Sequence, residues 1–416
     1  MKNDVSVKTI DEAAERLSGV VRKTPLQLSQ RLSKFYSASV YLKREDLQDV
    51  RSYKIRGAYN LIASLTQEEK KRGVVCASAG NHAQGVALSC TLLKIKGTIF
   101  MPTTTPLQKI SRVKHFGDGW IEVKLEGKNF DETSMAARKY CDKKKAVFVH
   151  PFDDDRVISG QGTVAKEIFE KLGEDIDYIV CPIGGGGLVS GVGTYLKTKN
   201  PNIKVIGVEP KGAQSMLESM KKGSVVTFDK LNPFVDGAAV KTVGTNTFNI
   251  ASKIIDEMVI VDEGKVCLTM IELYQSEGIV AEPAGALSIA ALDKIAKKIK
   301  GKTVVCVLSG GNNDILRYPE IMERSLVYQG LKHYFLIEFA QKPGQLKQLL
   351  NHALGPFDDI VRFEYVKKSS KEKGPALVGI ELSRKEDLEK LVEKMTKYGI
   401  SYTLLKSEDP LYSYLI

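Results

Sequence analysis

The chain has 416 residues, of which 43% are hydrophobic and 27% charged. At about 150 residues per domain this length predicts two to three domains, and the composition fits a soluble globular protein and excludes collagen-like, disordered and membrane-spanning classes. The net charge of +11 does not by itself indicate what the protein binds. Basic residues cluster at 143–145, 297–298 and 367–368, without interleaved aromatic residues. These clusters indicate solvated helix ends and not a nucleic-acid-binding surface.

Cysteines, histidines and the first residues carry little functional signal. The six cysteines include no Cys-x-x-Cys pair, which favours reduced, packed thiols. The five histidines show no metal-ligand spacing, so we expect no metal site built on them. Residues 1–17 lack the apolar core and cleavage site of a secretory signal, and we therefore expect a cytoplasmic protein.

Short β-branched runs alternate with segments of helical period along most of the chain. The predicted strands lie at residues 73–77, 97–101, 146–149, 178–181, 205–208 and 303–308. Continuous apolar strands separated by helices are typical of parallel sheets buried on both faces. Ligands of such sheets bind beyond the carboxyl ends of the strands, so the loops there are the candidate functional segments.

The segment at residues 51–58 places Lys54, between Ser52, Tyr53 and Ile55, at the predicted start of a helix. The positive end of the helix dipole would lower the pKa of an ammonium there, which suits a lysine that forms a Schiff base. An ordinary surface lysine is the alternative, and spacing alone does not decide between them.

Residues 76–85 follow a strand and open a helix, with Ser78, Ala79, Gly80, Asn81 and His82 at the turn. The unpaired amides of such a helix start bind anions. A plain helix cap is the alternative for this segment.

Two further loops follow strands. Residues 184–188 are Gly184, Gly185, Gly186, Gly187 and Leu188. Four glycines leave the backbone bare enough for several amides to converge on a phosphate, which fits a loop between a buried strand and a helix better than a flexible linker does. After the strand at 303–308, the hydroxyl of Ser309 stands at the strand tip, where it could bond a ligand ring atom.

The pattern changes after about residue 323. The remaining residues predict strand 333–339, helix 344–354, strand 360–366, strand 376–381, helix 385–398 and strand 401–405, which is the ferredoxin-like β-α-β-β-α-β order. The polar insert 367–373 is then the loop between the second and third strands, and residues 323–325 lie in a neck between the two parts.

Five motifs occur together: residues 52–58, 78–82, 184–188, 281–286 and 309–312. Together they resemble the tryptophan-synthase-β-like class of pyridoxal-phosphate lyases, and within it the biosynthetic threonine dehydratases, over about residues 5–323. Residues 324–416 resemble the ACT-like regulatory domain of those enzymes. The resemblance implies an α/β catalytic domain of fold type II at residues 1–323, two-lobed with the smaller lobe at about 54–150, and a ferredoxin-like ACT-like α+β domain at 324–416.

The resemblance also implies roles for individual residues. Lys54 would carry pyridoxal 5'-phosphate and take the Cα proton of the substrate, while Asn81 would bond the ring hydroxyl and Ser309 would meet the pyridine nitrogen. The phosphate would be held by Gly184, Gly185, Gly186, Gly187 and Leu188. The substrate carboxylate would be bound at Ser78, Ala79, Gly80 and His82.

A neutral hydroxyl at Ser309 cannot keep the ring nitrogen protonated, which favours β-elimination over racemisation or transamination. The implied reaction is the dehydration and deamination of L-threonine to 2-oxobutanoate and ammonia, the first step of isoleucine biosynthesis. The implied regulation is feedback by isoleucine, with valine as a further candidate, bound in the tail at residues 331–416 of a homotetramer.

Three positions refine the expectation. Ala79 stands where the related serine racemases carry a second serine, so racemisation should be weak. Ser215 stands where the metal-binding relatives place an aspartate, so a divalent-metal site is doubtful there. Glu209 and a backbone carbonyl could still hold a monovalent ion. Glu282 is either a pocket residue or, as we favour, the cap of the helix after Pro283. The alternatives are a catabolic threonine/serine dehydratase, a serine racemase, or a non-catalytic amino-acid sensor.

Overall fold

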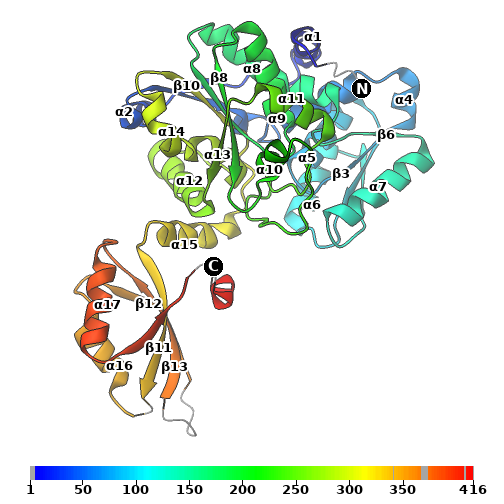
Figure 1. Ribbon diagram of the computed structural model, residues 1–416. Helices are drawn as coiled ribbons and strands as arrows, with labels where there is room; N and C mark the ends of the chain where they lie inside the picture. Colours follow the sequence, from blue (N-terminus) through cyan, green and yellow to red (C-terminus); the bar gives the residue numbers. More distant parts are fainter. Residues whose placement is uncertain (1–4, 341, 367–372, 407–408, 416) are drawn as a thin grey trace. The chain divides into compact units, whose positions relative to one another are not determined.

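The computed structural model describes residues 5–340, 342–366, 373–406 and 409–415. The chain divides into two compact units, one of Met1–Glu263 with Glu272–Asn313 and one of Gly264–Ile271 with Asp314–Ile416 (Figure 1). No helix in the described residues is long and apolar enough to cross a bilayer.

The first unit contains a large six-stranded sheet. Its strand order is β1 (Leu26–Leu28), β2 (Ser39–Arg44), β10 (Thr303–Leu308), β7 (Tyr178–Pro182), β8 (Lys204–Pro210) and β9 (Glu257–Val261). Every neighbouring pair is parallel except β1 with β2. The predicted strands at 178–181, 205–208 and 303–308 are therefore confirmed, with an antiparallel strand added at one edge.

Helices cover both faces of the large sheet, which is why its central strands are almost wholly apolar. One face packs against α1 (Val7–Leu17), α8 (Asp155–Leu172) and α9 (Gly187–Lys199) through a cluster that includes Ile10, Val164, Val189 and Val307. On the other face, Ser288 of α13 (Pro283–Ala290) donates a 2.8 Å hydrogen bond to the carbonyl of Val307. The other helices of this part are α2 (Gln30–Tyr36), α10 (Ser215–Lys222), α11 (Thr245–Ile254) and α14 (Leu292–Ile299). Helix α12 (Glu263–Glu277) is divided between the two units, since Gly264–Ile271 belongs to the second.

The same unit contains a small parallel sheet in the order β5 (Ile121–Leu125), β4 (Gly97–Met101), β3 (Val74–Ala77) and β6 (Val147–Phe148). Helices α3 (Lys54–Ala63), α5 (Asn81–Leu93) and α6 (Leu107–Gly117) share one apolar cluster with it, and α7 (Phe130–Lys144) packs on the opposite face. Figure 1 shows β3 between α5 and α7. Helix α4 (Gln67–Arg72) precedes β3, and a Thr66–Glu69 capping box starts it.

The second unit has an antiparallel sheet in the order β12 (Asp359–Tyr365), β13 (Lys373–Glu381), β11 (Lys332–Ala340) and β14 (Ser401–Leu404). With α17 (Asp387–Lys397) it confirms the ferredoxin-like order. The predicted helix at 344–354 is a four-residue α16 (Gln345–Gln348) continued by a π-helical turn, Leu349–Ala353. The polar insert predicted at 367–373 lies, apart from Lys373, outside the described residues.

The neck predicted at residues 323–325 lies in the middle of helix α15 (Tyr318–Tyr328), within the second unit, which begins at Asp314 in this part of the chain. Pro319 lies in the first turn, where its missing N–H costs no hydrogen bond. Ile321 and Ser325, four residues apart and so on one helical face, are buried. The physical signal for a helix was therefore present, although the polar run Glu-Arg-Ser concealed it.

Candidate active site

Lys54 is the first residue of α3 and lies half-buried at the carboxyl edge of the sheets. Its ammonium donates a 2.9 Å hydrogen bond to the carbonyl of Pro151, in the loop that follows β6. Burial lowers the pKa of Lys54 to about 8, although the nearby Glu282 carboxylate opposes the shift. The predicted direction is correct, but its main cause is burial and not the helix dipole.

Ser309 lies beside Lys54. The amide of Tyr53 donates to the carbonyl of Ser309 at 3.1 Å, and Ser52 pairs with Gly310 as an isolated β-bridge. The Ser309 side chain is 3% exposed, and its hydroxyl donates to the carbonyl of Ala284 at 3.3 Å. Backbone contacts thus bring the segment of Ser309 beside the segment that begins α3, and the role of the Ser309 hydroxyl toward a ring nitrogen stays a prediction.

The glycine loop connects β7 to α9 and has unpaired amides. In the described residues, the N–H groups of residues 184–188 donate to no protein acceptor, although all of these residues except Gly184 are buried. Buried N–H groups without partners are rare in folded proteins, so the loop is suited to an anionic ligand. This is the observation that fits a phosphate group to the site.

The glycines of this loop are required by what packs behind it. A Cβ at Gly185 would lie 2.2 Å from the ring of Phe152, and one at Gly187 would lie 2.9 Å from the carbonyl of Phe152. Gly186 has φ +92°, a conformation that L side chains rarely adopt. Thr247 donates a 2.6 Å hydrogen bond to the carbonyl of Gly185, which satisfies this buried acceptor. Phe152 also follows Pro151 directly, so one loop links the glycine loop to Lys54.

The start of α5 gathers the residues proposed for the substrate carboxylate. Ser78, Ala79 and Gly80 are half-buried, and the amide of Gly80 donates to the Ser78 hydroxyl at 3.2 Å. His82 is different: its side chain is buried and its Nε2 lies 2.9 Å from the carbonyl of Val149. Burial, with a smaller contribution from Lys54, lowers the pKa of His82 to about 3, so the ring is neutral and only its backbone amide is available to a carboxylate.

Asn81 and Glu282 meet across the site. Asn81 Nδ2 donates to Glu282 Oε1 at 2.7 Å, and Asn312 Nδ2 donates to Asn81 Oδ1 at 2.7 Å. The helix-cap interpretation of Glu282 is wrong, because its side chain makes no capping hydrogen bond to α13 and turns instead toward Asn81. Burial, followed by the nearby Asp236 charge, raises the pKa of Glu282 to about 7.

Several functional neighbours were not predicted. Pro151 and Phe152 follow a strand that was correctly placed, so the loop after it could have been examined like the others. Thr247 had no motif to mark it. Ser52 belongs to the motif at residues 52–58 but was given no role, and its buried hydroxyl has no partner in the described residues.

The Glu209 carboxylate is hydrogen-bonded to backbone amides of the protein. It accepts hydrogen bonds from the amides of Met216 and Leu217, at 2.7 and 2.9 Å, in the first turn of α10. Ser215 donates to the carbonyl of Val240. Within the described ranges no group of three or more His, Cys, Asp or Glu side chains is arranged to hold a metal ion.

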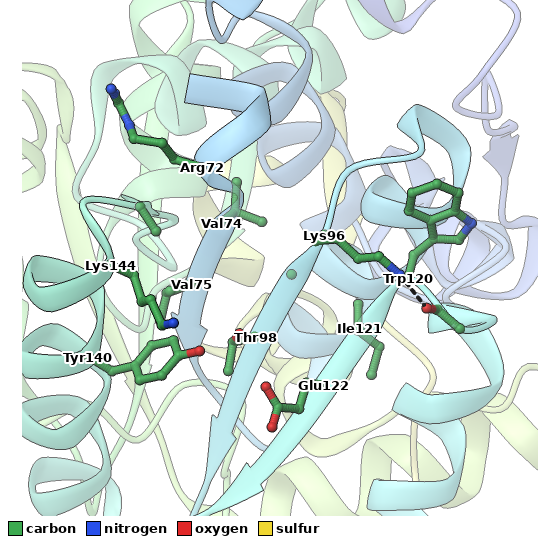
Figure 2. Close-up of a pocket in the computed structure, with 13 residues that line it drawn as sticks. Arg72, Val74, Val75, Lys96, Thr98, Trp120, Ile121, Glu122, Tyr140 and Lys144 are labelled. Atoms are coloured by element: carbon green, nitrogen blue, oxygen red, sulfur yellow. Dashed lines mark hydrogen bonds between the residues drawn. The ribbon is translucent and has the colours of Figure 1, made fainter. Parts of the chain in front are cut away.

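A cavity of about 460 Å³ lies at the amino-terminal edge of the small sheet (Figure 2). It is lined by the starts of β3, β4 and β5 and by Tyr140 and Lys144 of α7. Its cations diverge: Lys96 donates a 3.1 Å hydrogen bond to the carbonyl of Gly119. Figure 2 shows that Lys144 lies by Tyr140 and that Arg72 points away from the strands. Ligands of parallel sheets bind at the opposite edge, so this cavity is separate from the site around Lys54.

Comparison with known proteins identifies the family of both parts of the chain. A model of the pyridoxal-phosphate-dependent enzymes matches residues 17–310, and a model of the C-terminal regulatory domain of threonine dehydratase matches residues 323–415. The biosynthetic L-threonine dehydratases of Halalkalibacterium halodurans and Bacillus subtilis are 54% and 52% identical to the chain, covering 99% of it and 99% and 98% of their own lengths.

Solved structures confirm the fold. The processed form of threonine deaminase isoform 2 from Solanum lycopersicum has a TM-score of 0.73 at 39% identity, covering 76% of this chain and 92% of that one. Maize serine racemase has a TM-score of 0.72 at 31% identity, covering 78% of this chain and 98% of that one. The predicted fold type II architecture with a C-terminal regulatory domain is confirmed, and the chain belongs to the threonine dehydratase family of pyridoxal-phosphate-dependent enzymes.

Proposed function

We propose that the chain converts L-threonine to 2-oxobutanoate and ammonia, with pyridoxal 5'-phosphate attached to Lys54. The observation that carries the proposal is the set of buried, unpaired amides at residues 184–188, joined through Phe152 and Pro151 to a lysine with a lowered pKa. Near-full-length identity to biosynthetic threonine dehydratases supports the substrate.

Different residues of the site would bind different parts of the cofactor and the substrate. The amides of residues 184–188 would hold the phosphate, Asn81 would bond the ring oxygen, and the neutral hydroxyl of Ser309 would meet the ring nitrogen. When bound, the cofactor supplies an electron sink for the pair left at Cα. The first-turn amides of α5 bind the substrate carboxylate, and His82, neutral with a pKa of about 3, adds no charge there.

Lys54 moves the proton. Its amine takes the Cα proton, and the resulting ammonium can return it to the departing β-hydroxyl, so that the C–H and C–O bonds break and water leaves. The released enamine tautomerises to an imine, which water hydrolyses to the oxo acid and ammonia. Ala79 provides no hydroxyl on the opposite face, which supports elimination over racemisation.

The test of this function is an assay of the purified holoenzyme. Release of 2-oxobutanoate from L-threonine should exceed pyruvate release from L-serine, and chiral chromatography should find no D-serine. Accumulation of D-serine would favour a racemase, while a cofactor-loaded protein that leaves both amino acids unchanged would favour the sensor alternative.

We also propose that residues 324–416 are the regulatory domain of a cytoplasmic homotetramer, that residues 1–323 are the catalytic domain, and that residues 331–416 bind isoleucine. The match of residues 323–415 to a threonine dehydratase regulatory domain supports this division. Isoleucine is expected to weaken threonine binding by about 5- to 150-fold, and threonine to weaken isoleucine binding equally, because coupling is reciprocal. Calorimetry with each ligand alone and in the presence of the other measures both factors, and valine serves as the comparison.

Cofactor attachment to the apoprotein should accelerate with pH and level off above about pH 8. Only the neutral amine attacks the cofactor aldehyde; with a pKa of about 8, about one Lys54 side chain in ten is neutral at pH 7, against about one in three thousand for an ordinary lysine. Stopped-flow absorbance between pH 6 and 10 measures the rate. A rate that still rises tenfold per pH unit at pH 9 would contradict the lowered pKa.

A further inference from the structure

The hydrogen bonds around Asn81 have a fixed direction. A side-chain amide can normally be placed either way round, but here a backbone carbonyl decides it. Asn312 Nδ2 donates to the carbonyl of Val50 at 2.7 Å, and a carbonyl only accepts, so this end of Asn312 must be the NH₂ group. The same NH₂ group lies 2.7 Å from Asn81, whose facing atom is therefore the oxygen.

It follows that the NH₂ group of Asn81 faces Glu282. One of its two N–H bonds is directed to Glu282 Oε1 at 2.7 Å. The Asn81 oxygen already accepts from Asn312, and in the described residues the second N–H of Asn81 donates to no protein acceptor, so Asn81 offers a ligand a donor.

The Glu282 carboxyl group is held in place by its surroundings. The Glu282 side chain is 7% exposed, and its carboxyl group accepts a hydrogen bond from the amide of Asn312. A Cβ at Gly310 would lie 2.3 Å from Glu282 Oε1, so glycine at that position makes room for the carboxyl group. Asp236, Lys109 and Lys54 are close enough to act on its charge, and burial holds its pKa near 7.

We propose that Glu282 and Asn312 are positioning residues that hold the amide of Asn81 with its free N–H toward the ring oxygen of the cofactor, so that the site selects a ring that carries a hydrogen-bond acceptor there. The proposal deepens the proposed function, since it rests on the placement of the cofactor ring against Asn81. Neither residue needs to touch the reacting atoms, because each acts through Asn81.

The test compares two ligands of the apoprotein: pyridoxal 5'-phosphate and its 3-deoxy analogue, which lacks only the ring oxygen. Absorbance titration gives the Kd of each. In the wild type we expect the natural cofactor to bind about tenfold more tightly than the analogue, as one hydrogen bond to a charged acceptor allows. The preference should disappear in Asn81→Ala and fall to about threefold or less in Glu282→Ala and Asn312→Ala, with little change in the Kd of the analogue.

Glu282→Gln keeps an oxygen that can accept from Asn81 and should retain part of the preference, which also keeps the test valid if the alanine variant does not fold. The matched control is Glu257→Gln, at a surface carboxylate that is paired with Lys298. This variant should retain the full preference for the natural cofactor over the analogue. Melting temperatures of the apoproteins show whether each variant is folded.

The outcomes separate the two levels of the proposal. A full wild-type preference in folded Glu282→Ala and Asn312→Ala would overturn the positioning role. No preference in the wild type would overturn the placement of the ring against Asn81 and this inference with it. Borohydride labelling of Lys54 in the wild type would then show whether the proposed function itself still stands.

Discussion

Replacing Lys54 by alanine is expected to abolish covalent attachment of the cofactor and to lower kcat/KM for L-threonine by at least about a thousandfold. The reason is that this amine has two tasks, since it carries the cofactor and takes the Cα proton. Its lowered pKa of about 8 provides the neutral form that both tasks need. Borohydride reduction followed by peptide mass spectrometry measures attachment, and the assay of 2-oxobutanoate measures turnover.

Two variants control this result. Lys54→Arg keeps the positive charge but cannot form the covalent bond, so it should be as inactive as the alanine variant. Lys8→Ala, at an exposed position of α1, should behave as the wild type. Methylamine should restore part of the activity of Lys54→Ala by replacing the missing base. A borohydride label on a peptide without Lys54 would contradict the assignment of the lysine.

The central strands β10 and β7 could be predicted because they are continuous apolar runs, whereas the edge strands β5 and β9 were not predicted. β10 and β7 have all residues but the first buried, and their predicted bounds agree with the structure to within one residue. β5 reads Ile-Glu-Val-Lys-Leu and has no fully buried residue, and β9 has only two. The alternation of apolar and polar residues in β5 is the period-2 pattern of a half-buried strand, so this edge strand carried a local signal that was not used, and its pairing with β4 establishes it.

The residues of the site likewise include some that the sequence could predict and some that it could not. Residues whose role depends on their own loop, such as the glycines before Leu188, carry a local signal. Glu282 does not, because helix-capping rules predict a cap, while a hydrogen bond to Asn81, 201 residues earlier in the chain, determines where its carboxylate points. For Lys54 the sequence predicts the sign of the pKa shift, but the burial that causes it depends on the fold.

Replacing Arg56 by alanine is expected to lower the free energy of unfolding of the apoprotein by about 3–5 kcal/mol. Arg56, 1% exposed in α3, donates two hydrogen bonds of 2.8 Å to Glu45 and two, of 2.7 and 3.0 Å, to Glu167 of α8. Lys43 of β2 is the second cation of the cluster, bonded to Glu167 at 2.5 Å. Without Arg56, two carboxylates share one ammonium, and the penalty for the uncompensated buried charge appears in urea denaturation curves.

The pH dependence of this loss has a definite sign. Burial alone would raise the pKa of Glu45, but the charge and hydrogen bonds of Arg56, together with Lys43 and Thr24, outweigh it and hold the pKa below its usual 4.5. A lowered carboxyl pKa stabilises the fold above about pH 4.5, and the contribution is lost as the pH falls through the folded-state pKa. In Arg56→Ala the carboxyl group can instead take up a proton, so the difference from the wild type should be smaller at pH 5 than at pH 8.

Two further variants show whether charge balance or lost packing causes the effect. Arg22→Ala removes an exposed arginine whose pair with Asp49 is 64% and 45% exposed, and it should cost less than about 1 kcal/mol. The double variant Arg56→Met with Glu45→Gln leaves one cation, Lys43, with one anion, Glu167. It should recover much of the stability, because a buried ion pair replaced as a whole leaves no unpaired charge. If the double variant is as unstable as Arg56→Ala, Arg56 stabilises the fold through packing and not through charge.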